Sequence, residues 1–66
     1  MFSAPLPTLR ERKKAATKER LYFEALELFR HKGFSATTIE EIAEAAEVSK
    51  GTFFNYFPTK EALLHY

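Results

Sequence analysis

The sequence contains no cysteine and only two glycines, Gly33 and Gly51, in 66 residues. Without cysteine, disulfide bonds, iron–sulfur clusters and cysteine-ligated zinc are excluded. Two isolated glycines do not form a glycine-rich phosphate loop. The two histidines, His31 and His65, do not have the spacing of zinc ligands. Because no nucleophile–base set or paired acids are visible either, we expect no metal, no cofactor and no enzymatic activity.

Long hydrophobic runs are also missing. The longest apolar stretches are a few residues, such as residues 62–64, whereas a membrane-spanning helix needs about 18 or more. The first residues have neither the basic start nor the apolar segment of a secretory signal. We therefore expect no membrane partner and a location in the cytoplasm.

Charge is distributed unevenly along the chain. The formal net charge is +1, but residues 1–18 carry +4, residues 19–48 carry −4 and residues 49–66 carry +1. Residues 1–17 include Pro5 and Pro7 and are interpreted as a flexible basic leader. Because residues 9–19 are rich in good helix formers, the alternative is that the leader continues into the first helix. Its charges either are simply solvated or neutralise phosphates.

Helix signals fill the rest of the chain. Apolar residues at helical spacing from Leu21 predict a first helix that ends near residue 32, before Gly33. Thr38 and the glutamate three residues later form a capping box for a helix over about residues 39–46. Ser49 caps a third helix that Pro58 ends. A fourth begins after residue 59 and looks cut off at residue 66.

Residues 38–57 have the length and layout of a helix-turn-helix, although spacing alone also fits a generic helical bundle. Around the second helix of this unit, Phe53 and Phe57 define the buried side. Gly51, Thr52 and Asn55 point most nearly away from them. Such a helix contacts bases through its amino-terminal residues, and a glycine there permits close approach to DNA.

The individual residues are more informative than their spacing. The series is Gly33-Phe34, Thr37-Thr38-Ile39, Ile42-Ala43, Ala46, Val48-Ser49, Gly51-Thr52, Phe54, Tyr56-Phe57, Lys60 and Leu63. It closely resembles the N-terminal DNA-binding domain of TetR-family transcriptional regulators, over about residues 18–66. The resemblance implies an all-α, homeodomain-like fold of three helices plus the start of a fourth.

The resemblance also implies a function. Members bind operator double-stranded DNA, typically as dimeric repressors, and a larger C-terminal domain dimerises and binds a small-molecule inducer. We therefore expect this chain to be the operator-reading part of a longer bacterial protein, and we expect the C-terminal domain of that protein to be absent from this chain. Alone it would be monomeric, whereas the full-length protein would be a homodimer associated with the nucleoid. The alternative is a small helical protein-interaction module.

Site residues follow by position. The resemblance places Thr38 near the DNA backbone, Phe54 near the DNA, and Tyr56 and Lys60 on phosphates. Asn55 has the chemistry to pair with adenine. Two departures from the family pattern stand out. Glu47 occupies a turn position that usually holds glycine, which predicts either slight local strain or an adjusted turn. Phe54 replaces a tyrosine. The expected DNA-binding residues are Thr38, Lys50, Gly51, Thr52, Phe54, Asn55, Tyr56 and Lys60.

Overall fold

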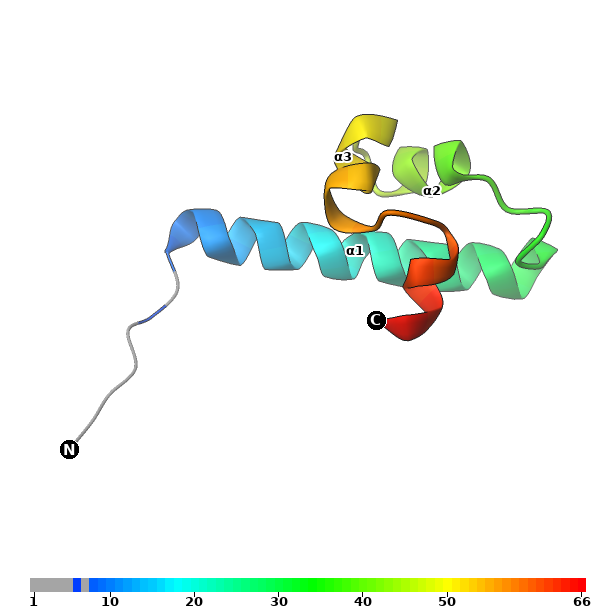
Figure 1. Cartoon of the computed structure of the whole chain (residues 1–66), viewed down its shortest axis with the longest axis horizontal. Helices are drawn as coiled ribbons and strands as arrows, with labels where there is room; N and C mark the ends of the chain where they lie inside the picture. The colour runs from blue at the N-terminus through cyan, green and yellow to red at the C-terminus, as the bar shows by residue number, and fades with distance from the viewer. Residues whose placement is uncertain (1–5, 7) are drawn as a thin grey trace.

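The computed structural model describes residue 6 and residues 8–66. It contains α1 (Leu9–Lys32), α2 (Ile39–Ala45), α3 (Lys50–Tyr56) and a 3₁₀ helix, η1 (Glu61–His65). In Figure 1, α2 and α3 lie along one side of the carboxyl-terminal part of α1, and the amino-terminal part of α1 extends beyond them. The predicted all-α class is confirmed over the described residues. None of their helices is both long enough and apolar enough to cross a membrane.

Helix α1 begins at Leu9, well before the first apolar stripe residue. A capping box starts it: the Thr8 hydroxyl accepts from the Glu11 N–H at 3.2 Å, and the Glu11 carboxylate accepts from the Thr8 N–H at 3.0 Å. Residues 9–17 are helical, so over these residues the structure has the alternative given above, in which the leader continues into the first helix, and not a flexible segment. The flexibility predicted for residues 1–5 and 7 concerns positions outside the described residues.

The predicted end of α1 is found at Lys32. Gly33 follows with φ 90°, and its N–H donates to the Phe29 carbonyl at 2.9 Å. The loop then turns around Thr37, a fully buried polar side chain whose hydroxyl donates to the Gly33 carbonyl at 2.8 Å. This bond satisfies the buried hydroxyl and fixes the path of the chain into α2.

The turn from α2 to α3 depends on one left-handed residue. Glu47 has φ 60°, as its departure from glycine predicted. Its N–H donates to the Glu44 carbonyl at 3.0 Å, and the Val48 N–H donates to the Ala43 carbonyl at 2.9 Å. This pair of bonds is the Schellman arrangement, which satisfies the last carbonyls of α2. Val48 then packs against the core, so the turn is pinned from inside.

Helix α3 has the predicted boundaries, but the fourth helix differs from expectation. Ser49 caps α3 by accepting from the Thr52 N–H at 3.1 Å, and Phe57, before Pro58, is extended. Beyond it, the expected α-helix is the short 3₁₀ helix η1. Only five residues are involved, and the Ala62 and Leu63 N–H groups bond three residues back instead of four. Such i→i+3 bonding is usual for short pieces.

The core lies where the four elements meet. Figure 1 shows α2, α3 and η1 gathered around the middle and end of α1. Small alanines in α2 allow the helices to approach closely, and Phe53 fills the centre with no exposed surface. The buried apolar residues are Leu21, Ala25, Ile42, Ala43, Ala46, Phe53, Phe57 and Leu63.

The left-handed turn gives a stability prediction. A Cβ atom in this conformation costs roughly 1–2 kcal/mol, and glycine loses roughly 0.5–1 kcal/mol more backbone entropy on folding. Glu47→Gly and Glu47→Ala both remove the carboxylate that contacts Arg20 at 2.6 Å, and only Glu47→Gly relieves the strain. We expect Glu47→Gly to exceed Glu47→Ala in free energy of unfolding by about 0.5–1 kcal/mol in urea titrations. Equal stabilities would contradict the strain assignment.

Candidate nucleic-acid interface

One side of α3 is buried and the other is open. Phe53 and Phe57 are in the core, whereas Gly51 and Asn55 are exposed, as the helical phase predicted. Thr52, predicted to point away from the core as well, is half-buried, and Lys50 is exposed at the amino-terminal end. Phe54 lies between these two sides, with 44% of its surface exposed. The accessible side of α3 thus offers a bare stretch of backbone at Gly51 and the side-chain amide of Asn55, two groups that can contact a polar partner.

The first turn of α3 is held by side-chain bonds. The Ser49 and Thr52 hydroxyl oxygens lie 3.0 Å apart, so Thr52 is half-buried and oriented by the cap. The Lys50 ammonium donates to the Glu40 carboxylate on α2 at 2.8 Å, and this bond lowers the pKa of Glu40. These contacts fix the amino-terminal end of α3 against α2 without covering its open side.

Gly51 has no structural reason to be glycine. Its φ is not positive, since Gly33 is the positive-φ glycine of the described chain, and a Cβ added to Gly51 would meet only the Ser49 hydroxyl at an ordinary 3.8 Å. Glycine inside a helix costs about 1 kcal/mol relative to alanine. The fold therefore accepts a destabilising residue at an exposed position where alanine would fit.

Thr38 sits at the start of α2. Its hydroxyl accepts from the Glu41 N–H at 3.1 Å, and its own N–H donates to the Glu41 carboxylate at 2.9 Å. This is the predicted capping box. Thr38 stays exposed while it caps the helix, so a capping role and contact with a partner are compatible.

The Lys60 side chain is directed towards the α1–α2 loop, whereas a lysine that only contacts phosphate would extend into solvent. Its ammonium donates to the Phe34 carbonyl at 2.7 Å and to the Thr37 carbonyl at 3.0 Å. It also lies 4.3 Å from the centroid of the Phe34 ring. Two of its three donors therefore tie the start of η1 to the α1–α2 loop. The sequence did not predict this structural role, because the two carbonyls belong to Thr37 and Phe34, which lie 23 and 26 positions before Lys60 in the chain.

Tyr56 belongs to a concave surface that extends onto α1. The open concavity has a volume of about 400 Å³, and one third of its lining residues are lysines. The sequence predicts a basic leader that can continue into the first helix and neutralise phosphates, but it does not predict that these residues lie beside Tyr56. The signal was present, since positions 10, 13, 14 and 17 have the spacing of one helical face. The lining residues are Leu9, Arg10, Lys13, Lys14, Thr17 and Tyr56.

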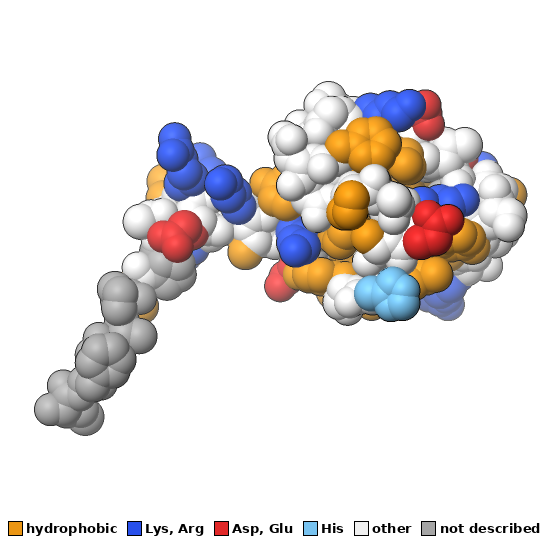
Figure 2. Space-filling view, in the orientation of Figure 1, with side chains coloured by type: hydrophobic (Ala, Val, Ile, Leu, Met, Phe, Trp, Pro, Cys, Tyr) orange, Lys and Arg blue, Asp and Glu red, His pale blue; other side chains and the backbone are white. Residues whose placement is uncertain are grey.

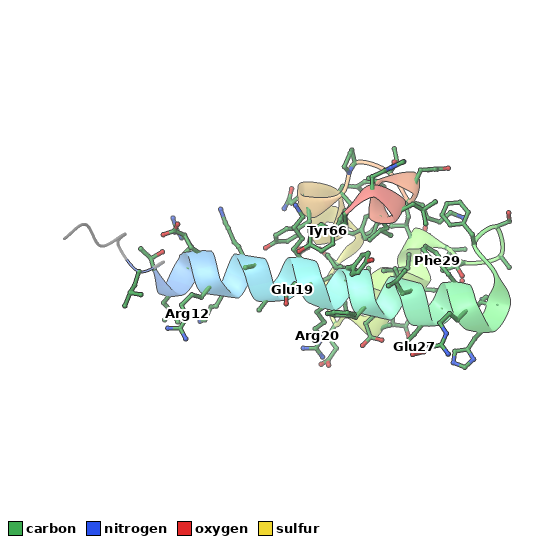
Figure 3. All side chains as sticks on the ribbon, turned by 90° about the horizontal axis from the view of Figure 1, so that it is seen from below. Arg12, Glu19, Arg20, Glu27, Phe29 and Tyr66 are labelled. Atoms are coloured by element: carbon green, nitrogen blue, oxygen red, sulfur yellow. The ribbon has the colours of Figure 1, made fainter. Side chains whose placement is uncertain are left out.

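The acidic side chains of α2 and the following turn are largely neutralised within the fold. Glu40 pairs with Lys50, Glu41 with Lys32, and Glu47 with Arg20 of α1. Figure 3 shows Arg20 projecting from the middle of α1. These pairs reduce the repulsion that an acidic stretch would exert on an anionic partner. Among residues 6 and 8–66, no three histidine or acidic side chains gather into a metal-binding set.

A comparison with protein families identifies the architecture. The model described as "Bacterial regulatory proteins, tetR family" matches residues 17–66, three quarters of the chain. The chain belongs to the tetR family. This membership confirms the resemblance seen in the sequence, and it agrees with the DNA-binding helix-turn-helix layout of α2 and α3.

Curated relatives agree with the family model. The HTH-type transcriptional regulator TcmR of Streptomyces glaucescens is 53% identical over 55 residues, 83% of this chain and 24% of the relative. The uncharacterized HTH-type regulator YuxN of Bacillus subtilis is 54% identical over 48 residues, 71% of this chain and 16% of the relative. RutR of Escherichia coli K12, also an HTH-type transcriptional regulator, is 46% identical over 54 residues, 82% of this chain and 26% of the relative.

These matches cover little of the relatives. The chain spans about a quarter or less of the length of TcmR, YuxN and RutR. No solved structure matches the chain. The tetR-family assignment therefore applies to a helix-turn-helix region that makes up a small part of these regulators.

The inward direction of Lys60 predicts a stability effect. Lys60→Met keeps the aliphatic length but removes the ammonium from two carbonyls, and bonds to charged groups contribute about 1.5–3 kcal/mol. We expect a loss of about 1–3 kcal/mol in free energy of unfolding by urea titration. Lys50→Met, which removes a more exposed ion pair, should cost less than about 1 kcal/mol. Similar losses for both variants would contradict the tether assigned to Lys60.

The capping box of α2 predicts a pH dependence. The Lys32 ammonium, followed by the Thr38 N–H, holds the pKa of Glu41 at about 2, below its ordinary 4.5. This contribution to stability is complete above pH 4.5 and is lost as pH falls from 4.5 towards 2, because the unfolded chain binds the proton first. Glu41→Gln should flatten the decline of Tm over that range. Glu44→Gln, an exposed neighbour on α2, should leave the decline as steep as in the parent chain.

Proposed function

We propose that this chain reads operator DNA sequence-specifically, as the amino-terminal part of a longer TetR-family repressor. In this proposal the open side of α3 enters the major groove. Lys50, Gly51 and Thr52 lie at its amino-terminal end, where helix-turn-helix proteins contact bases, and Asn55 follows one turn later. Asn55 has the two-point hydrogen-bonding geometry that matches adenine.

Backbone contacts fix the orientation of the helix on the duplex. Thr38 is exposed at the amino end of α2 and can meet a phosphate there. Tyr56, at the other end of α3, lines the concavity and carries a hydroxyl that can bond a phosphate. Phe54 adds an apolar edge suited to a thymine methyl group. Lys60 has one donor left for a phosphate while the other two hold the α1–α2 loop.

The observation that carries the proposal is Gly51. An exposed helical position where alanine fits, yet glycine stands, is explained if another molecule approaches the backbone more closely than a Cβ allows. DNA is the partner that the family assignment and the accessible polar groups of α3 favour. A single chain would bind weakly and with strong salt dependence.

The longer protein would supply the remaining properties. Two recognition helices about 34 Å apart read successive major grooves, so the full-length protein would be a homodimer, whereas this chain alone would be monomeric. A small-molecule inducer would bind the regulator outside its helix-turn-helix region. The complete regulator would act in the bacterial cytoplasm, on the nucleoid.

Gly51→Ala separates stability from function. The substitution should raise the free energy of unfolding by about 0.5–1 kcal/mol, because alanine is the better helix former. The same variant should weaken binding to the duplex selected from a random library by the parent chain, measured by fluorescence anisotropy. Asn55→Ala is the complementary variant, and it should relax selection at one base pair by about 1–3 kcal/mol.

Three outcomes would contradict the proposal. The first is that the library yields no enriched sequence. The second is that Gly51→Ala binds as tightly as the parent chain, and the third is that Asn55→Ala leaves the base preference unchanged. Failure of all duplex binding at low salt would favour a protein-interaction module instead. Phe23, whose surface is 60% exposed, would then be the first residue to test.

A further inference from the structure

The amino-terminal part of α1 carries cations that the fold does not use. In the folded body, Arg20, Arg30, Lys32 and Lys50 have carboxylate partners, Lys60 binds carbonyls, and Lys18 lies over the Phe57 and Tyr66 rings. We call residues 9–17 of α1 the arm. Its cations have no carboxylate partner within 4 Å among the described residues. They are Arg10, Arg12, Lys13 and Lys14.

Three of these cations lie on one face of the arm. Arg10, Lys13 and Lys14 line the concavity that includes Tyr56, whereas Arg12 does not. At about 100° per residue, Arg12 lies about 200° around the helix from Arg10. Figure 3 shows Arg12 projecting to the side of α1 opposite Tyr66. We call the side of the arm that carries Arg10, Lys13 and Lys14 the basic face. The opposite side of the arm carries Arg12.

The basic face points the same way as α3. Counting along the helix, Arg10 and Lys14 continue the stripe that Leu21 and Ala25 bury against the other helices. Figure 2 shows basic side chains of the arm projecting towards the side of the molecule on which α2 and α3 lie. The face is also presented on regular helix, since the Thr8–Glu11 capping box starts α1 before it.

We propose that this basic face is a second DNA-contacting surface, which binds the phosphates beside the base pairs that α3 reads. Tyr56, at the end of α3, joins the two surfaces through the shared concavity. The arm is about 13 Å long, and B-DNA carries about eight phosphate charges over that length of axis. The surface is accessible, basic and aligned with α3, which is what contact with one continuous duplex requires. This inference rests on the proposed function.

A matched pair of variants tests the arm. Arg10→Gln and Arg12→Gln make the same change two residues apart, and glutamine preserves the helix propensity of arginine. Affinity for a 20-base-pair random duplex is measured by fluorescence anisotropy over a range of KCl concentrations. Each lost phosphate contact should lower the slope of log affinity against log salt by about 0.9. We expect that loss for Arg10→Gln, about twice that for Arg10→Gln with Lys14→Gln, and no loss for Arg12→Gln.

The outcomes separate the arm from the reading helix. Equal slopes for Arg10→Gln and Arg12→Gln would overturn the arm proposal, because DNA would then respond to the total charge of the arm and not to the side on which each cation lies. If the parent chain binds DNA and Gly51→Ala weakens it, such equality leaves the proposed function standing. If the parent chain binds no duplex at low salt, both proposals fail. Binding to anionic vesicles instead of DNA, lost in Arg10→Gln alone, would assign the face to a membrane surface and overturn the proposal.

Discussion

The burial of Phe53 is the contact on which the arrangement depends. Its ring has no exposed surface and lies in the cluster that joins α1, α2, α3 and η1. Removing such a ring typically costs about 3–5 kcal/mol, whereas 66 residues are expected to have about 3–10 kcal/mol of total stability. One side chain therefore determines both whether the chain folds and which side of α3 faces outward. The exposed positions on α3 are accessible because Phe53 and Phe57 occupy the opposite side.

The interface carries features that a fold optimised only for stability would avoid. Gly51 weakens α3, and the four cations on the arm have no carboxylate within 4 Å among the described residues. Elsewhere the same chain pairs its charges, as in Lys32 with Glu41 and Arg20 with Glu47. The charges of the folded body are paired, whereas those of the arm are not. A polyanionic partner that meets both the arm and α3, as proposed above, would account for this contrast.

Local signals in the sequence were sufficient for most of the fold. Gly33, Thr38 and Pro58 mark helix ends through the backbone geometry of a few neighbouring residues, and the strain at Glu47 follows from its position in the turn. The direction of Lys60 did not follow, because a flexible side chain chooses among distant carbonyls only after the elements have packed. The position of the arm's basic face likewise required knowing which side of α1 the other helices cover.

The central claim is that the open side of α3 faces DNA. The most direct test is to record amide NMR shifts of the isotope-labelled chain during titration with a random-sequence duplex, at low and then moderate salt. The account predicts salt-sensitive shifts across α3 and at Thr38, together with shifts in the arm. Shifts confined to the arm, or none at low salt, would contradict the claim, since the duplex would then meet only charge and not the surface that Phe53 positions.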